Sequence, residues 1–303
     1  MEMTFDERVN FYLGEEFINM DTININSFTD VKTIKNLTKN TFAHDLVYDC
    51  PLKKLLIKTN HTNRKFMFQR ADIMSVQPLI TLCKNRCDGN NQSVILRCLN
   101  FDRHWKNYYK KPADKPFQQK ESVVFWRGTT TGASDSPAAT IWNPRIVNRF
   151  QMVEMYFNTN RQIDVGFSSI HREWLKPKYS KFIKKAVSIT HFLKYKYLLS
   201  IEGNDKDSGL NWKLNSNSLV IMPKPRVCSW LMETTLIPNF HYVLIKDDFS
   251  DLKEQLFWCN NNQAQCQSII NNAHTHMRQF ANNANEVKIE EAVINKYFTI
   301  LQE

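Results

Sequence analysis

The chain has 303 residues, 42% of them hydrophobic and 23% charged, so it is long enough for two domains and is neither disordered nor fibrous. No apolar run reaches the roughly eighteen residues that span a bilayer, and the acidic N-terminus shows no signal-peptide pattern. The formal net charge of +10 favours an acidic partner, whether nucleic acid, an anionic membrane surface or a phosphorylated substrate, although a solvated basic face gives the same balance.

In chain order, the first part predicts short strands and one helix. Apolar runs predict strands at 55–57, 66–68 and 93–99, and the stretch 75–85 predicts a helix. The polar, proline-bearing stretch 110–120 predicts a linker.

Beyond this linker, strands and helices alternate. Strands are expected at 122–126, 165–167, 197–201, 218–222 and 241–245, and helices at 145–159, 183–195, 250–260, 264–283 and 287–301. Such alternation is typical of parallel α/β structure, and the linker near residue 115 suggests two such domains.

The seven cysteines are odd in number and irregularly spaced, which argues against a disulfide framework and fits a reducing cytosol. Cys83 and Cys87 are spaced as one helical turn and could ligate zinc. Because no second Cys/His pair accompanies them, no metal site is predicted.

Two strands end in polar loops that contain glycine: residues 126–132 (WRGTTTG) and 202–209 (EGNDKDSG). In parallel sheets, ligands bind beyond the carboxyl ends of strands. Glycine lets the backbone approach a ligand, and N–H groups, hydroxyls and an arginine can hold phosphate oxygens. Neither loop is a Walker or GxGxxG motif, and each alone could be an ordinary turn. Together they predict a ligand site.

These landmarks belong to an ordered series that resembles glycosyltransferase family 90. The series is F-W-R-G, N-P-R (143–145), K-Y-K-Y with the glycine-containing loop, S-L-V, L-x-P-x-x-H-Y-V and D-D-F-S-D-L, over roughly residues 95–260. The short chain, the E-G-N-D loop and S-W-L-M-E (229–233) resemble the bacterial lipopolysaccharide core branch most.

The resemblance implies an α/β protein with the GT-B fold: two facing Rossmann-like domains with an interdomain active-site cleft. An N-terminal acceptor-side domain is expected over 1–118, a nucleotide-sugar-binding domain over 119–280, and a C-terminal helix over 281–303 that packs back on the first domain. It also implies inverting, metal-independent transfer of a hexose from a UDP-sugar, with no cofactor besides this donor substrate.

The resemblance also implies which residues bind the donor. They are Arg127, Gly128, Thr129, Thr130, Arg145, Glu202, Gly203, Asn204, Asp205, Ser208, Gly209 and Lys213. Cations and N–H groups here would stabilise the charge that develops on the diphosphate leaving group. Lys213 stands where the family usually has arginine, so a point charge replaces a bidentate fork. Trp126 or Trp212 could stack on uracil, or could simply belong to the core.

Asp102, just after the strand at 93–99, is the implied catalytic base that deprotonates the acceptor hydroxyl. Its order relative to Arg103 departs from the family pattern, and the alternative is a carboxylate that pairs with Arg103 or caps a helix. Glu233 could bind a sugar hydroxyl or cap a helix. His241 is predicted to be a structural, hydrogen-bonded histidine.

The implied partners are a UDP-hexose and a lipopolysaccharide core acceptor, with Lys106 and Lys110 on the acceptor side. The implied location is cytoplasmic and peripheral, on the anionic cytoplasmic face of the inner membrane. No nucleic-acid motif is present, so nucleic acid is not expected as a partner. The alternative is a non-catalytic sugar- or nucleic-acid-binding protein on the same scaffold.

Overall fold

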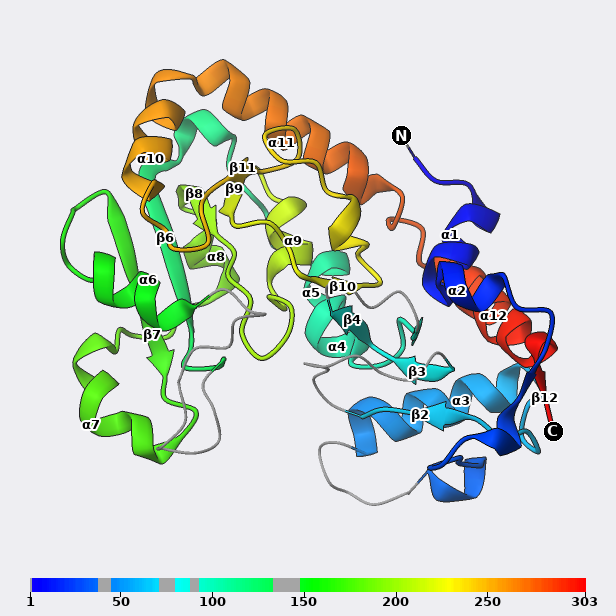
Figure 1. Ribbon diagram of the computed structural model, residues 1–303. Coiled ribbons are helices and arrows are strands. Elements are labelled where there is room, and N and C mark those ends of the chain that lie inside the picture. Colours follow the sequence, from blue (N-terminus) through cyan, green and yellow to red (C-terminus); the bar gives the residue numbers. More distant parts are fainter. Residues whose placement is uncertain (1, 38–44, 71–79, 88–92, 133–147) are drawn as a thin grey trace. The chain divides into compact units, whose positions relative to one another are not determined.

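The computed structural model describes residues 2–37, 45–70, 80–87, 93–132 and 148–303. The chain divides into two compact units (Figure 1). Unit 1 comprises Met1–Lys106, Val227–Met232 and Gln279–Glu303, and unit 2 comprises Asn107–Arg226 and Glu233–Arg278. The domains predicted over 1–118, 119–280 and 281–303 and the GT-B arrangement stay predictions.

Unit 2 is built on a five-stranded sheet. Its strands are β6 (Glu121–Thr129), β7 (Ile163–Ser169), β8 (Tyr195–Leu199), β9 (Leu219–Met222) and β11 (Val243–Leu244). They lie in the order β11-β9-β8-β6-β7, and every neighbouring pair is parallel. The order is doubly wound, because the chain adds β7 on one side of β6 and the later strands on the other.

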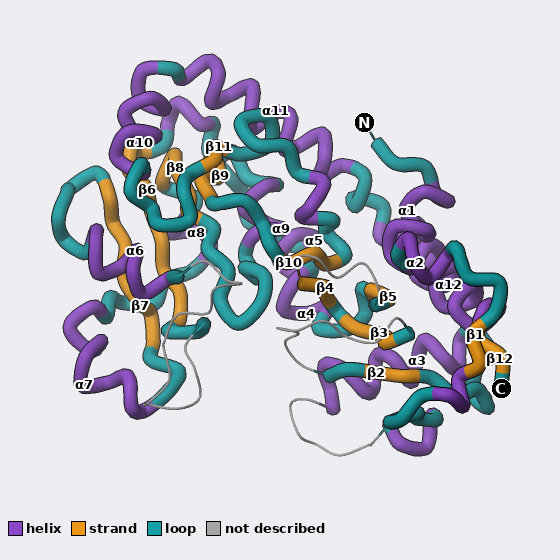
Figure 2. The backbone as a smooth tube through the Cα atoms, in the orientation of Figure 1, coloured by secondary structure: helices purple, strands orange, loops and turns teal. Residues whose placement is uncertain are grey.

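Helices lie beside this sheet (Figure 2), and side chains of the sheet and the helices form two hydrophobic cores. The larger core takes side chains from α6 (Arg149–Tyr156), α10 (Leu252–Asn261) and α11 (Gln263–Arg278), and the smaller one from α8 (Ile189–Phe192) and α9 (Leu210–Leu214). Trp126 belongs to the larger core and its neighbour Phe125 to the smaller one, as the pleat of β6 requires. Burial on both faces explains the continuous apolar runs of these strands. A short helix, α7 (Lys176–Tyr179), follows β7.

Unit 1 has three small sheets among its described residues. β2 (Met67–Phe68), β3 (Thr81–Cys83) and β5 (Val94–Ile95) are parallel; β4 (Asn85–Cys87) pairs antiparallel with β10 (Val227–Ser229); and β1 (Ile23–Asn24) pairs in parallel with β12 (Leu301–Gln302). Its helices are α1 (Phe5–Leu13), α2 (Glu15–Ile18), α3 (Cys50–Lys58), α4 (Phe101–His104) and α12 (Asn283–Ile300), and α5 (Lys106–Tyr109) follows α4.

A buried ion pair joins α1 to α12 in unit 1. Arg8 donates to the two carboxylate oxygens of Glu286 at 2.5 and 2.7 Å, and their side chains are 3% and 0% exposed. Trp230 donates its indole N–H to Glu286 at 2.6 Å and stacks on Tyr12 with ring centroids 3.7 Å apart. This network anchors the short segment 227–232 within unit 1.

The coarse prediction of a parallel α/β protein is confirmed, but the strand predicted at 55–57 is wrong. These residues lie in α3, which has Pro51 in its first turn. Leu52, Leu55 and Leu56 are buried, and Ile57 is 56% exposed. This is helical spacing, and proline is well tolerated at the start of a helix.

The prediction of a helix at 75–85 is also wrong for the residues that the structure describes, because 81–83 and 85–87 form the strands β3 and β4. Cys83 and Cys87 therefore lie on two strands and not on one helical turn, and both are buried. The helix predicted at 183–195 shortens to α8. All seven cysteines are free thiols.

Candidate functional site

The topological switch point of the unit 2 sheet lies between β6 and β8. These are the first and third strands of the sheet along the chain, yet they are neighbours, with β7 on the far side of β6. In a doubly wound sheet, ligands bind at the carboxyl ends of such a pair because the crossovers leave in opposite directions. The strand predicted to end at residue 126 continues to Thr129, so of the predicted loop at 126–132 only residues 130–132 lie beyond β6, whereas the loop at 202–209 lies wholly beyond β8.

The two loops contact each other directly. The N–H of Gly132 donates to Asn204 Oδ1 at 2.8 Å. A Cβ on Gly203 would lie 2.4 Å from Thr131 Oγ1, so a larger residue there would force the loops apart. Gly132 has a φ of +89°, a conformation that favours glycine. The structure therefore brings the two sequence-predicted loops into one place.

Arg149, which the sequence reading did not single out, ties the loops together. It is the first residue of α6, whose start is fixed by the Asn148 side chain accepting two backbone N–H groups. Its guanidinium donates to Ile201 O at 2.7 and 3.1 Å, to Glu202 O at 3.0 Å and to Thr131 Oγ1 at 2.6 Å. A buried cation thus holds the ends of β6 and β8 in register.

Lys213, in α9, is buried and paired. Its Nζ lies 2.6 Å from Asp207 Oδ2 and donates to Leu199 O at 2.9 Å, while Ser200 Oγ donates to Asp207 Oδ2 at 2.7 Å. Burial alone would raise the pKa of Asp207, but the Lys213 charge and these hydrogen bonds outweigh burial and hold that pKa below its ordinary value. Burial lowers the pKa of Lys213, although Asp207 opposes this shift. The Lys213 ammonium therefore already has an anionic partner.

A second buried pair fixes the loop between β8 and α9. Lys206 Nζ lies 2.6 Å from Glu233 Oε1, each side chain is 1% exposed, and Lys206 also donates to Asn211 Oδ1 at 2.9 Å. Glu233, predicted to bind a sugar hydroxyl or cap a helix, is an ion-pair partner of Lys206, and both predictions stay open. Gly209 N–H donates to Asp207 Oδ1 at 2.9 Å, which fixes the loop where it joins α9.

The other residues of the second loop that were predicted to bind the sugar donor are Glu202, Asp205 and Ser208. Glu202 Oε1 accepts from Arg226 N at 3.0 Å, and the carbonyl of Asp205, a residue that is 4% exposed, accepts from Gly203 N at 2.8 Å. Ser208 is half-buried. The loop's backbone is therefore ordered by its own polar groups.

Arg127 points along the sheet toward β7. It donates to both carboxylate oxygens of Asp164 at 2.9 Å, and Lys184 Nζ lies 2.6 Å from the same carboxylate. Burial would raise the pKa of Asp164, but the bonds from Lys184 and Arg127 hold it below its ordinary value. Among the described residues, no contact joins Arg127 to the 202–209 loop. To hold a diphosphate, it would have to exchange Asp164 for the ligand.

The other residues of the first loop are packed at the end of β6. A Cβ on Gly128 would lie 2.5 Å from the Trp126 ring, so the glycine lets the indole cover the strand. Thr130 is fully buried, and its hydroxyl accepts from His171 N at 2.7 Å. The Thr129 hydroxyl is 3.5 Å from that of Thr131.

The residues assigned to catalysis and the acceptor are exposed. Asp102 lies in the first turn of α4, and within the described chain it makes no hydrogen bond or ion pair, with Arg103 or otherwise. Lys106 and Lys110, in and just after α5, are also exposed. Arg145 lies outside the described residues.

The aromatic and histidine candidates have structural positions. Trp126 is 2% and Trp212 5% exposed, and they belong to the larger and smaller cores, so the core alternative holds for both rings. His241 Nδ1 accepts from Ile237 N at 2.9 Å, which confirms the predicted structural role. Burial lowers the pKa of His241.

No group of three or more His, Cys, Asp or Glu side chains is placed to hold a metal ion in the part of the chain that the structure describes. No helix in those same ranges has the length and apolar character needed to cross a membrane.

Unit 2 is thus a doubly wound α/β unit with a ligand position at the switch point of a parallel sheet, an arrangement shared by many nucleotide-binding proteins. The sequence profile of glycosyl transferase family 90 matches residues 97–303, and the chain belongs to this family. The resemblance read from the sequence landmarks is confirmed. Membership makes the protein a glycosyltransferase, with a sugar donor and an acceptor as substrates.

The chain is also similar to individual bacterial and viral proteins. The O-glucosyltransferase LpsA of Dichelobacter nodosus is 34% identical over 251 residues, which cover 82% of this chain and 71% of that protein. Uncharacterized protein 179R of Invertebrate iridescent virus 6 is 26% identical over 210 residues, and uncharacterized protein 035R of Invertebrate iridescent virus 3 is 23% identical over 174. The matches cover 17% and 15% of these viral proteins, so the likeness there concerns a small part of much longer chains.

Proposed function

We propose that the protein transfers a hexose from a UDP-sugar to a sugar hydroxyl of a lipopolysaccharide or lipooligosaccharide core, with inversion and without a metal ion. The observation that carries the proposal is the pair of loops joined by Arg149 at the switch point, in a chain of family 90. The name of the bacterial relative, an O-glucosyltransferase, supports a hexose as the transferred sugar.

The donor would lie against the ends of β6 and β8, contacting residues 127–130, 145 and 202–213. Charge develops on the diphosphate as the glycosidic bond breaks, so N–H groups and cations here would stabilise the transition state. Lys213 and Arg127 are held by Asp207 and Asp164 in the structure, so each would change partner when the diphosphate binds. The two ion pairs would thus hold the cationic side chains in position before the donor binds.

Asp102 would act as the base. The acceptor hydroxyl would attack the anomeric carbon as Asp102 takes its proton, and UDP would leave from the opposite face, which inverts the anomeric configuration. An exposed carboxylate without a described partner is free to accept that proton. General-base catalysis typically contributes about 10²–10⁴-fold to the rate.

The test compares Asp102→Asn with Asp6→Asn, an exposed carboxylate in the first turn of α1. UDP should raise the melting temperature of the wild type and of both variants, because binding to the folded state stabilises it. Transfer from UDP-hexoses should fall by about 10²-fold or more in Asp102→Asn alone. Retained transfer would remove Asp102 from the chemistry, and the lack of a UDP effect on wild-type melting would contradict the donor proposal.

Metal independence is tested separately: activity lost in EDTA and restored by a divalent ion would contradict it.

The acceptor side and the membrane surface are tested by charge reversal. Lys106→Glu with Lys110→Glu should weaken use of a purified core acceptor and leave UDP affinity unchanged. The matched control is Lys253→Glu with Lys288→Glu, two exposed lysines outside this segment that make the same change in net charge. Binding to anionic vesicles should be peripheral and weaken with salt, since each basic residue contributes about 1 kcal/mol within a Debye length. Equal acceptor use by both double variants would show that the two lysines are ordinary surface charges.

A further inference from the structure

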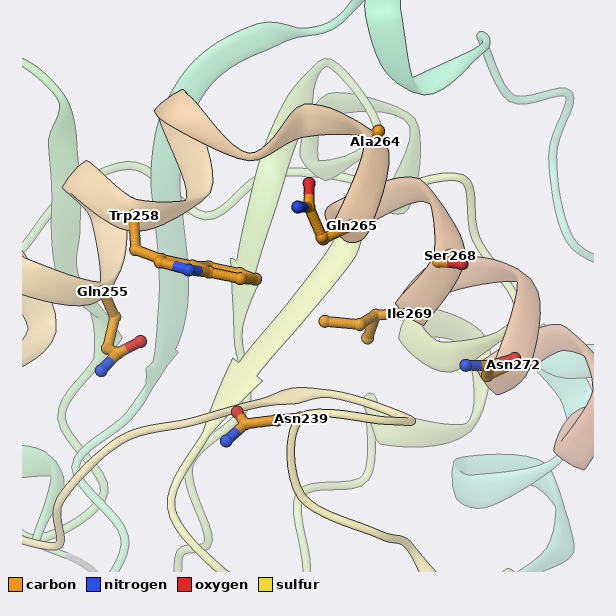
Figure 3. A pocket seen from close by; sticks show the side chains of 8 residues that line it. All are labelled: Asn239, Gln255, Trp258, Ala264, Gln265, Ser268, Ile269 and Asn272. Atoms are coloured by element: carbon orange, nitrogen blue, oxygen red, sulfur yellow. The ribbon is translucent and has the colours of Figure 1, made fainter.

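A groove of about 750 Å³ lies between α10, α11 and the loop that precedes β11 (Figure 3). Its volume is within the range of small-molecule sites, about 300–1,000 Å³. The groove is built entirely within unit 2.

The groove is distinct from the loops at the switch point. Asn239, on its lower wall in Figure 3, precedes β11, whereas those loops end β6 and β8. The strands are all parallel, so residues before one strand and after another lie at opposite edges of the sheet. The helices α10 and α11 lie at the edge where β6 begins (Figure 1). A ligand in this groove would not occupy the donor position.

An indole and a ring of neutral polar side chains line the groove. Trp258 of α10 packs against the larger core, and its ring extends across the groove toward Ile269 of α11 (Figure 3). None of the described lining residues is charged, in a chain of net charge +10. The polar lining residues are Asn239, Gln255, Gln265, Ser268 and Asn272.

Most of these polar groups are not used by the fold. The side chains of Gln255, Gln265, Ser268 and Asn272 make no hydrogen bond to any other described residue. Asn239 Oδ1 accepts from Leu244 N at 3.1 Å, which holds the residue in place. Several hydrogen-bond donors and acceptors therefore line the groove, and a ligand would have to displace only water from them.

We propose that this groove binds a neutral saccharide, with one pyranose ring against Trp258 and its hydroxyls paired with the amide side chains. A pyranose has an apolar face of C–H groups, which suits a flat indole, and a rim of hydroxyls that donate and accept hydrogen bonds as amides do. A phosphate or carboxylate would find no counter-charge among the described lining residues and would lose hydration. The inference does not rest on the proposed donor, acceptor or base.

The experiment measures binding of maltotriose and cellotriose, neutral trisaccharides with α and β linkages, by saturation-transfer NMR with saturating UDP present. Trigalacturonic acid is the charged comparison. Trp258→Ala should abolish binding. Trp174→Ala is the matched control, because Trp174 is also a partly buried tryptophan packed against the same core but lies outside the groove.

A second pair of variants distinguishes a loss of saccharide binding from a loss of folded protein. Gln265 is exposed, so Gln265→Ala should leave melting unchanged and weaken trisaccharide binding about fivefold or more, a loss of about 1 kcal/mol. Gln267→Ala, on the same helix but outside the groove, should bind as the wild type does.

Four results would overturn the proposal. They are the lack of wild-type binding to either neutral trisaccharide at about 10 mM, equal binding of the charged one, displacement by UDP, and equal loss in the two tryptophan variants. Ile237 and Phe240, in the loop that carries Asn239, are 52% and 47% exposed and could favour a lipid surface instead. Vesicle binding lost in Trp258→Ala, without saccharide binding by the wild type, would assign the groove to lipid.

Discussion

Replacing Arg149 with lysine keeps the positive charge and removes the fork that joins the two loops. The guanidinium donates to Thr129 O at 3.3 Å, Thr131 Oγ1 at 2.6 Å, Glu202 O at 3.0 Å and Ile201 O at 2.7 Å. A lysine ammonium has its three donors on one atom and would keep about two of these four acceptors. Each buried acceptor left unpaired costs about 1–3 kcal/mol, so the loss of two should lower the free energy of unfolding of Arg149→Lys by about 2–6 kcal/mol.

The same change should affect the donor site separately from stability. With the loops no longer held together, binding must order them, and we expect UDP affinity to fall about tenfold, which is 1.4 kcal/mol. Urea unfolding measures the first effect and titration calorimetry with UDP, at a temperature where the variant is folded, measures the second. The control is Arg161→Lys, an exposed arginine of the same unit, for which both should change by less than about 0.5 kcal/mol. Wild-type UDP affinity in a destabilised Arg149→Lys would show that the loops do not bind the donor, and wild-type stability would refute the count of lost bonds.

Three further results are expected. Glu286→Gln should lower the free energy of unfolding by about 3–5 kcal/mol, because it leaves a buried guanidinium without its anion. Glu291→Gln, on the same helix but paired with a lysine that is 59% exposed, should cost less than about 1 kcal/mol in the same urea titration. Gly203→Ala should weaken UDP binding more than Gly209→Ala, where the nearest atom to a new Cβ is 3.2 Å away instead of 2.4 Å. Asp207 has a pKa below its unfolded value of about 3.9, so its contribution to stability is present above that pH and is lost on acidification; melting curves from pH 6 to 3 should fall less steeply for Asp207→Asn.

The sequence located the two loops because their signals are local. An apolar run marks a buried strand, and glycine with polar residues marks where it ends, so residues 126–132 and 202–209 could be read without a structure. The strand order that makes them neighbours is a property of the whole sheet. From the sequence, only the general rule that ligands bind at the carboxyl ends of parallel strands could be applied.

The roles of individual cations could not be read in this way. Arg127 and Lys213 stand next to the loops in sequence, but their partners, Asp164 and Asp207, are set by the packing of β7 and α9. Arg149 could not be found from the sequence because it is far along the chain from the first loop. It stands at the start of a helix whose N-cap is a single asparagine, which is a weak signal. The strand predicted at 55–57 failed because three apolar residues fit either period, and the helical spacing becomes visible only when Leu52 is counted with them.

The chain passes between the two units four times, at residues 106–107, 226–227, 232–233 and 278–279. Arg8 and its partner Glu286 are 278 residues apart, and β1 pairs with β12. During synthesis at about 5–20 residues per second, α1 therefore waits for roughly a quarter of a minute to a minute before α12 leaves the ribosome. All residues assigned to unit 2 precede residue 279, so its sheet can form while the early part of unit 1 still lacks α12. We therefore expect the N-terminal segment to be the part of the nascent chain that waits longest for its native partners.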